Sequence, residues 1–481
     1  MDLKKIKSIH FTGIKGVGMT ALALCANDLG IKVTGSDIEE RFVTDETLKK
    51  AGIFWKPGFK KENIGNPDLL VFTAAHGGQS NIEVVAAEAK NIPVLSHAQA
   101  LGLFMNGKDA ISVCGVGGKT TTSAMLATIF DVAGFHPSYT IGAGNINPIG
   151  NPGKYDQKGR YFIAEADEYF TSPQDLKPRF FYQNPKIAVI SNVEFDHPDV
   201  YKDFNQTLKT FQTFITKVPN DGLIVICIDN PNNRKLLQLI SARSRSAPGG
   251  KSPVETYGFS PEADWRITLI NQSNKKVFFK VKHRDLAINE LILSVPGRFN
   301  VKNAVAALIT ANFCGIPINK IKKGLERFKG TKRRFELVKE IKGVRLYDDY
   351  AHHPIQIKAT LKAAKKWFKN KRIVVVFQPH TYTRTKALFK EFSQSFANAD
   401  LIIITDIYAS AREKKDSRIS GRMLAQEINK LQANVVYKNG RKEVTEFMKL
   451  KAKKGDIIFT LGAGDIFNRH SSIAKAIESK Q

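Results

Sequence analysis

Cysteine is scarce in this sequence, with four residues among 481. The four are isolated and stand in apolar stretches, at Cys25, Cys114, Cys227 and Cys314. Their spacing makes no paired metal site, and the chain lacks the cysteine density of a small secreted scaffold. We therefore expect buried free thiols in a reducing compartment.

Long hydrophobic runs are also missing, and none approaches the roughly 20 residues that cross a bilayer. The opening MDLKKIKSIHFTG carries charge but no apolar segment of the kind found in secretory signals. Both absences predict a cytoplasmic protein with no membrane partner. The remaining composition, 42% hydrophobic and 25% charged, is that of a globular chain, and its length predicts two to four domains.

Acidic residues are few beside the basic ones, 45 Asp and Glu against 73 Lys and Arg, which gives a formal charge of +28. Such a surplus can serve nucleic acid, an anionic membrane or phosphorylated small molecules. The basic residues are scattered, as in LKKIK and AAKKWFKNKR, and they form no dense tail or arginine-rich arm. We expect a lysine-rich solvated surface and no nucleic-acid partner.

Short β-rich runs alternate with helical stretches along the chain, which predicts an α/β protein with parallel, doubly wound sheets. The pattern restarts near residue 109 and again near residue 330. We predict three domains: a Rossmann-like domain at 1–107, a central P-loop ATPase-type α/β domain at 108–329 and a Rossmann-like α/β domain at 330–481. Within the central domain, residues 241–254 are predicted to be a loop, and residues 265–270 and 276–283 a hairpin.

A first glycine cluster, GIKGVGM, places Gly13, Gly16 and Gly18 between a predicted strand and a predicted helix. Glycines there let backbone N–H groups approach a pyrophosphate, and the helix N-terminus adds partial positive charge. Asp37 ends the next strand, near the distance at which a Rossmann acid meets a ribose. The order G-x-x-G-x-G is not the dinucleotide pattern, so a tight structural turn is the alternative to a diphosphate site.

A second cluster, GVGGKTTT, lies at the junction of the first strand and first helix of the central domain. The standard phosphate loop has a glycine six residues before its lysine, and Val113 stands there instead. The loop still supplies N–H donors, a lysine for the outer phosphates and a hydroxyl for Mg²⁺. The predicted ATP-contacting residues of this loop are Gly115, Gly117, Gly118, Lys119, Thr120 and Thr121.

Acidic residues end two adjacent buried strands of the same domain. The run AEADEY contains Glu165, Asp167 and Glu168. The run NVEFDHPD contains Asn192, Glu194, Asp196, His197 and Asp199. Ligands of α/β sheets bind at strand ends, and one or two carboxylates are enough for Mg²⁺ because it keeps several waters. Each acid taken alone could be a solvated charge on a loop. Two acidic clusters at adjacent strand ends are better explained by a metal site, which we predict there.

The third domain carries DDYAHHP, residues 348–354, and FQPHTYTR, residues 377–384, each after a predicted strand. Both runs are expected on one rim of the sheet. Their paired acids, paired imidazoles, His380 and Arg384 could bind a small amino acid or a phosphate. Metal ligation by His352 and His353 is the alternative that the spacing leaves open.

In order and spacing, these runs resemble the Mur ligases over nearly the full length of the chain. GVGGKTTT resembles the short ATP loop of that family, usually G-T-H-G-K-T-T-T, with Val116 and Gly117 in place of Thr-His. GRFNVKNA resembles its adenine-contacting G-x-H-N-x-x-N run, with Phe299 in place of the histidine.

The resemblance implies roles for individual residues. A UDP-sugar would bind at Gly13, Gly16, Gly18, Ser36 and Asp37 in the first domain. Mg²⁺ ligands would be Thr120, Glu165 and His197. Further ATP contacts would be Asn300, Asn303, Arg334 (at the γ-phosphate) and Asp348 or Asp349. An amino-acid pocket would contain Tyr350, His352, His380 and Arg384. The catalytic set would be Lys119, Arg334, His352 and His380.

The implied reaction is ATP-dependent joining of L-alanine to the carboxylate of UDP-N-acetylmuramate through an acyl phosphate, by a monomer or homodimer. The nearest alternative is a recycling ligase that adds the tripeptide L-Ala-γ-D-Glu-diaminopimelate to the same sugar nucleotide. A more distant alternative is an NAD(P)-dependent oxidoreductase that uses the first glycine cluster, but it leaves the second loop and its acids unexplained.

Overall fold

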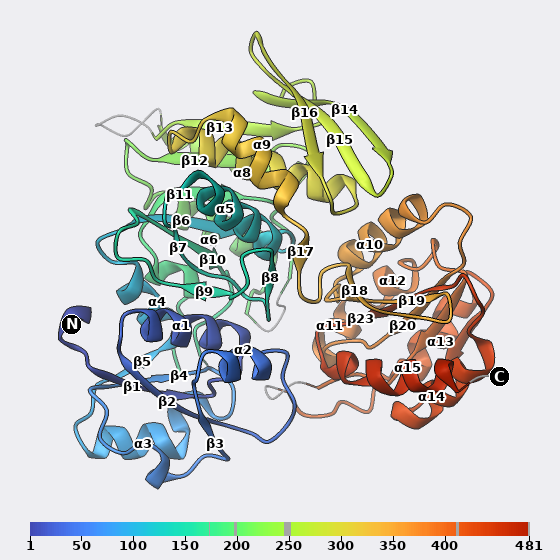
Figure 1. Ribbon diagram of the computed structural model, residues 1–481, viewed down its shortest axis with the longest axis horizontal. Coiled ribbons are helices and arrows are strands. Elements are labelled where there is room, and N and C mark those ends of the chain that lie inside the picture. The colour runs from blue at the N-terminus through green and yellow to red at the C-terminus, as the bar shows by residue number, and fades with distance from the viewer. Residues whose placement is uncertain (173, 197–199, 245–251, 410–412, 480–481) are drawn as a thin grey trace. The chain divides into compact units, whose positions relative to one another are not determined.

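The computed structural model describes residues 1–172, 174–196, 200–244, 252–409 and 413–479 (Figure 1). The chain forms two compact units. The first comprises Met1–Ser294 with Asn300–Thr331, and the second comprises Val295–Phe299 with Lys332–Gln481. The first unit contains two large sheets, and the second contains one.

The N-terminal sheet has five parallel strands in the order β3-β2-β1-β4-β5. They are β1 (Ser8–Thr12), β2 (Lys32–Asp37), β3 (Trp55–Pro57), β4 (Leu69–Phe72) and β5 (Val94–Ser96). The helices are α1 (Val17–Asp28), α2 (Asp45–Lys50), α3 (Ile82–Ala89) and α4 (His97–Met105). The chain runs from β1 to β2 and β3 on one side of β1 and then crosses to β4 on its other side, so the ends of β1 and β4 form the crevice where such sheets bind ligands. The predicted doubly wound sheet is confirmed.

The central sheet has ten strands in the order β16-β15-β14-β13-β12-β11-β6-β10-β7-β9. They are β6 (Asp109–Cys114), β7 (Ser138–Thr140), β9 (Gly153–Lys154), β10 (Tyr161–Ala166), β11 (Pro185–Ile190), β12 (Leu223–Cys227), β13 (Val254–Gly258), β14 (Trp265–Ser273), β15 (Lys276–His283) and β16 (Leu286–Leu293). Its helices are α5 (Lys119–Ala133), α6 (Phe204–Ile215), α7 (Pro231–Ser244), α8 (Arg298–Phe313) and α9 (Ile318–Arg327). Two short strands, β8 (Ile146–Asn147) and β17 (Gly330–Thr331), pair separately.

The predicted hairpin is confirmed as β14 and β15. A third antiparallel strand, β16, pairs with β15 and was not predicted. The predicted loop at 241–254 is wrong at its start, because α7 continues to Ser244, and at its end, where β13 begins at Val254. Serine, alanine and arginine extend an existing helix at little cost, so composition alone misplaced the boundary. The middle of that segment lies outside the described residues.

The two sheets of the first unit are joined through α1 and α4, which lie between them in Figure 1. The thiol of Cys25 on α1 donates to the Tyr139 carbonyl of β7 over 3.4 Å. A side chain at Gly153 on β9 would come within 1.9 Å of the Ala21 carbonyl, so only glycine permits this approach. The helix α4 packs against the short helix η4 (Arg179–Tyr182). These contacts fix both glycine loops within one unit.

The second unit has a six-stranded sheet in the order β18-β19-β23-β20-β21-β22. Its strands are β18 (Glu336–Ile341), β19 (Val344–Asp349), β20 (Ile373–Phe377), β21 (Leu401–Ile404), β22 (Val435–Tyr437) and β23 (Ile457–Leu461). Only β18 runs antiparallel to its neighbour, β19. The helices are α10 (Pro354–Trp367), α11 (Tyr382–Ala387), α12 (Phe389–Ser393), α13 (Gly421–Asn429), α14 (Gly440–Lys451) and α15 (His470–Glu478). The predicted third α/β unit is confirmed, with a mixed sheet.

All four cysteines are free thiols, and three of them are buried. Across the described ranges, no helix has the length and apolar character needed to span a bilayer.

Candidate active site

The loop of the second glycine cluster joins β6 to α5 and is held tightly by its neighbours. Gly115 and Gly118 have positive φ angles of 117° and 96°. A side chain at Gly115 would lie 2.4 Å from the Ser191 hydroxyl, and one at Gly118 would lie 2.6 Å from the Asn303 side-chain oxygen. Both positions therefore require glycine, for backbone conformation and for space.

The end of β11 anchors this loop. The N–H of Gly117 donates to the Asn192 side-chain oxygen over 2.8 Å, and the Val116 N–H donates to the Asn192 carbonyl over 3.1 Å. The Ser191 hydroxyl donates to the Gly117 carbonyl over 2.6 Å. Ser191 was not predicted, and it could have been found only from the pairing of β11 with β6.

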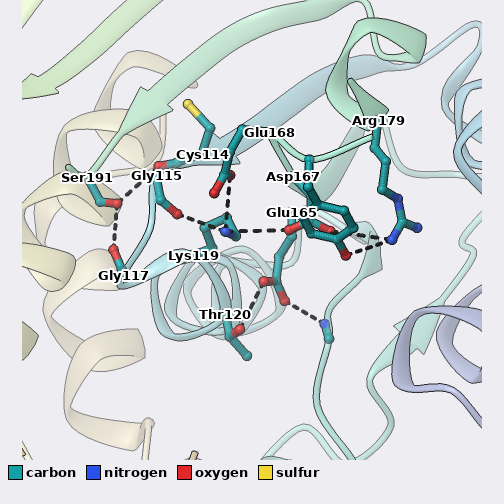
Figure 2. Close-up of polar contacts among 12 residues, drawn as sticks. Cys114, Gly115, Gly117, Lys119, Thr120, Glu165, Asp167, Glu168, Arg179 and Ser191 are labelled. Atoms are coloured by element: carbon teal, nitrogen blue, oxygen red, sulfur yellow. Dashed lines mark hydrogen bonds and ion pairs between the residues drawn. The ribbon is translucent and has the colours of Figure 1, made fainter. Parts of the chain in front are cut away.

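Lys119 is the first residue of α5, and its ammonium is surrounded by acceptors (Figure 2). It donates to the Gly115 carbonyl over 2.8 Å and lies 3.4 Å from Glu168 and 3.5 Å from Asp167. Burial opposes its charge, but Glu168 and Asp167 outweigh burial and raise the pKa of Lys119 above its ordinary value. The lysine is therefore a permanent cation at the phosphate loop.

Thr120 and Glu165 form the predicted oxygen pair beside this lysine. The Thr120 hydroxyl donates to one oxygen of Glu165 over 2.9 Å, and the Gly142 N–H donates to the other over 2.6 Å. Hydroxyl and carboxylate oxygens are the hard donors that Mg²⁺ accepts together with water, so these two residues fit that ion. The third predicted ligand, His197, lies outside the described residues. No group of three or more His, Cys, Asp or Glu side chains suited to a metal occurs within the described residues.

Helix α8 brings the two predicted amides to the loop. Asn300 and Asn303 are both buried, and the Asn303 amide donates to the Asn300 side-chain oxygen over 3.2 Å. Asn303 is also the residue that a side chain at Gly118 would strike. The remaining predicted loop residue, Thr121, lies half-buried in the first turn of α5.

Arg179 and His97 lie beside the acidic residues Glu165 and Asp167, and neither was predicted to belong to the site. The Arg179 guanidinium donates to the Tyr169 hydroxyl over 2.7 Å, lies 3.9 Å from Asp167 and contacts the His97 imidazole. Burial, reinforced by Arg179, lowers the pKa of His97 to about 3, so the ring is neutral. No local motif marks either residue, because their contact depends on the packing of α4 against η4.

The first glycine loop has the predicted shape, with Gly13 at a φ of 82° and Gly16 at the start of α1. A side chain at Gly18 would come within 3.0 Å of the His97 imidazole, so that position is also constrained. Asp37 accepts from the N–H groups of Lys15 and Ile38 over 2.7 and 2.8 Å. Burial raises the pKa of Asp37 despite these donors. The carboxylate thus already braces the loop.

Ser36 points into a buried polar cluster around Glu83, whose carboxylate accepts from its hydroxyl. The other donors to Glu83 are Thr12, His10, Asn63 and the Lys60 N–H. Burial alone would raise the pKa of Glu83, but the side-chain donors outweigh it and lower the pKa to about 2. Through these hydrogen bonds the Glu83 carboxylate connects β1, β2 and the segment after β3. This role of Glu83 was not predicted.

In the second unit, both predicted acids are engaged inside the fold. Asp348 accepts from the Arg333 guanidinium over 2.9 Å, and Asp349 accepts from the N–H groups of Phe335 and Ala351 over 2.8 Å each. Burial opposes the charge of Asp348, yet Arg333 and His470 hold its pKa below the usual range. Arg333 itself, the neighbour of the predicted Arg334, was missed.

The predicted amino-acid residues gather at one edge of the second unit. The ring centroids of Tyr350 and His352 are 5.2 Å apart, and those of His352 and His380 are 6.0 Å apart. Arg384 donates to the His380 carbonyl over 3.0 Å, and the Arg334 guanidinium lies 4.8 Å from the Tyr350 ring. The structure therefore brings two imidazoles, a phenol and two guanidinium groups together.

Comparison with known proteins matches three consecutive segments of the chain to Mur ligase domains. Residues 8–109 match the description "Mur ligase family, catalytic domain", residues 113–311 "Mur ligase middle domain" and residues 333–464 "Mur ligase, glutamate ligase domain". This chain belongs to the Mur ligase family. Its β6–α5 loop and acids lie in the middle segment, and its imidazole cluster lies in the third.

Similar proteins and structures are known from several bacteria. A protein of Caldanaerobacter subterraneus subsp. tengcongensis named UDP-N-acetylmuramate–L-alanine ligase is 39% identical over 97% of each chain. The crystal structure of UDP-N-acetylmuramate–alanine ligase from Thermotoga maritima has a TM-score of 0.78 and 26% identity, covering 98% of this chain and 100% of that one. The structure of the UDP-N-acetylmuramate:L-alanyl-γ-D-glutamyl-meso-diaminopimelate ligase of Neisseria meningitides has a TM-score of 0.59 and 28% identity, over 68% of this chain and 100% of that one.

Proposed function

We propose that this Mur ligase joins L-alanine to the carboxylate of UDP-N-acetylmuramate and converts ATP to ADP and phosphate in the same reaction. The observation that carries the proposal is the 39% identity, over 97% of both chains, to a protein named for that reaction. Likeness along the whole length matters because the substrates of such a ligase would bind to different domains. A nicotinamide-dependent oxidoreductase does not fit a chain of this family.

ATP binds at the β6–α5 loop in this proposal. Lys119 neutralises the outer phosphates, the N-terminus of α5 adds partial positive charge, and Asn300 and Asn303 lie on the adjoining helix α8, suited to contact the adenine. Arg334, on the second unit, stabilises the charge that develops at the γ-phosphate. Asp348 and Asp349 contribute indirectly to ATP binding. Their oxygens already accept hydrogen bonds from Arg333, Phe335 and Ala351, so they fix the backbone on either side of Arg334 and Tyr350.

Mg²⁺ is the metal that the site would hold, through the Thr120 hydroxyl and the Glu165 carboxylate. When bound, it supplies positive charge to the triphosphate. Glu165 is preset for this role because the Gly142 N–H fixes the carboxylate oxygen that does not face Thr120.

The chemistry proceeds by activation of the sugar carboxylate. A carboxylate oxygen attacks the γ-phosphorus, ADP leaves, and the resulting acyl phosphate is attacked by the L-alanine amine to give a tetrahedral intermediate. Collapse of that intermediate forms the amide and releases phosphate. The protein contributes positioning and charge neutralisation.

The other substrates are assigned by domain. UDP-N-acetylmuramate binds at the first glycine loop of residues 1–107, where Gly13, Gly16 and Gly18 present no side chains to its diphosphate and the N-terminus of α1 adds partial positive charge. L-Alanine binds in residues 330–481 among Tyr350, His352, His380 and Arg384, whose imidazoles and guanidinium suit a carboxylate. The formal charge of +28 favours encounter with both polyanionic nucleotides, and these substrates suit a cytoplasmic enzyme.

The choice of amino-acid substrate is tested by steady-state phosphate release with ATP, Mg²⁺ and UDP-N-acetylmuramate. We expect kcat/KM for L-alanine to exceed that for the tripeptide L-Ala-γ-D-Glu-diaminopimelate by about 100-fold or more, since a site that holds a single amino acid by its carboxylate would not accommodate the two further residues of the tripeptide. Glycine serves as the matched control for the missing methyl group and is expected to be about 10-fold poorer. A preference for the tripeptide would show a recycling ligase instead.

A further inference from the structure

Lys119 is held by the protein's own acids. Its ammonium lies 3.5 Å from one oxygen of Asp167 and 3.4 Å from Glu168, and its side chain is 14% exposed. If the lysine binds ATP phosphates, as proposed above, it must turn from these carboxylates toward the nucleotide. Asp167 is partly buried, with its side chain 24% exposed, and a partly buried carboxylate that loses its cation is left with an uncompensated charge, which is unfavourable. The loop therefore needs a second cation for the carboxylate that Lys119 leaves.

The two oxygens of Asp167 face different cations. The oxygen Oδ1 is the one near Lys119, whereas Oδ2 accepts from the Tyr169 hydroxyl over 3.1 Å and lies 3.9 Å from Arg179. The Tyr169 hydroxyl in turn accepts from Arg179 over 2.7 Å. Asp167 thus stands between a lysine that has to move and an arginine already aligned with its other oxygen.

Arg179 is fixed from several sides and cannot leave with the lysine. Its backbone N–H donates to the Tyr169 carbonyl over 3.0 Å, and its guanidinium contacts the imidazole of His97 on α4. A small cavity of about 20 Å³, bordered by His97, Glu165, Asp167 and Arg179 among others, lies beside this group. The guanidinium already lies 3.9 Å from Oδ2 of Asp167, so only a short movement separates it from a direct hydrogen bond to that carboxylate.

We propose that Arg179 is a positioning residue that takes over the Asp167 carboxylate when Lys119 turns to the phosphates of ATP. Arg179 lowers the free energy needed to release the lysine and does not itself touch the nucleotide. The inference rests on the proposed function, because it assumes that Lys119 binds the triphosphate.

Calorimetric titration of the full chain with the ATP analogue AMP-PNP and Mg²⁺ tests this role. We expect Arg179→Met to weaken binding about 10-fold or more, because among the described residues Lys119 is then the lysine or arginine that remains within 4 Å of Asp167. Adding Asp167→Asn should restore affinity to within about threefold of wild type, because the neutral amide no longer retains the lysine. Arg179→Lys, which keeps the charge, should retain most of the affinity. The matched control is Arg160→Met, an exposed arginine 2.7 Å from Asp109, which should bind as wild type does.

The double variant separates exchange from a structural role. If Arg179 only supports the fold, the two substitutions add, and the double variant binds as weakly as Arg179→Met or more weakly; that result overturns the proposal. Asp167→Asn alone decides the matter if Arg179→Met does not fold: unchanged or tighter binding supports exchange, and weakening beyond threefold overturns it. Absence of AMP-PNP binding by the wild type would instead contradict the proposed function itself.

Discussion

Lys119→Ala is expected to lower L-alanine-dependent phosphate release by about 10³-fold. The lysine begins α5, directly after a loop whose backbone is fixed by two glycines and Asn192, so the fold itself sets the position of its ammonium group. Its raised pKa keeps it charged at any working pH. The measurement is phosphate release with saturating ATP, UDP-N-acetylmuramate and L-alanine.

Lys276→Ala is the matched control for that variant. Lys276 lies on β15 of the central sheet and forms an ion pair with Glu326 over 3.0 Å. Both side chains are at the surface, where an ion pair contributes little to stability. The turnover of Lys276→Ala should equal that of the wild type. Turnover of Lys119→Ala within about threefold of wild type would remove the proposed role of the loop.

Glu83→Gln is expected to destabilise the N-terminal sheet by about 3 kcal/mol at pH 7, the free energy that corresponds to a pKa lowered from 4.5 to about 2. Donors face both oxygens of this carboxylate: Thr12 donates to one over 2.8 Å and Asn63 to the other over 2.8 Å. A glutamine offers one oxygen, so one set of donors would meet an NH₂ group. Thermal unfolding monitored by circular dichroism measures the loss.

The same carboxylate predicts the acid sensitivity of the sheet. Because the folded pKa of Glu83 lies below the unfolded value, its stabilisation is complete above about pH 4.5 and disappears as the pH falls toward about 2. The wild type should lose melting temperature in that window more steeply than Glu83→Gln. Glu88→Gln, on the exposed side of α3, is the control and should follow the wild type. Parallel acid curves for wild type and Glu83→Gln would contradict this account.

Much of the fold and of the phosphate loop could be predicted because the signals are local. The run GVGGKTTT predicts its own conformation, because glycine is favoured where φ is positive, as at Gly115 and Gly118, and Lys119 is the first residue of a helix. Parallel strands end at one edge of their sheet, so the acids at the end of β10 were expected near that loop. Glu165 indeed meets Thr120 there.

Side-chain direction and packing between distant segments could not be predicted. Asp348 and Asp349 are consecutive on a strand, so they point to opposite faces and find different partners. Asp348 accepts a hydrogen bond from the Arg333 guanidinium, and Asp349 accepts from backbone N–H groups. The roles of Glu83 and Arg179 depend on which strands and helices become neighbours, and no spacing in the chain encodes that.

Isotope transfer from the sugar nucleotide to phosphate tests the central claim most directly. UDP-N-acetylmuramate labelled with ¹⁸O in its carboxylate is incubated with enzyme, unlabelled ATP, Mg²⁺ and L-alanine, and the released phosphate is analysed by mass spectrometry. Activation through an acyl phosphate predicts that each phosphate carries a single ¹⁸O atom, because the bridging oxygen leaves with phosphorus when the amide forms. Phosphate free of ¹⁸O, released at the rate of amide formation, would contradict this account.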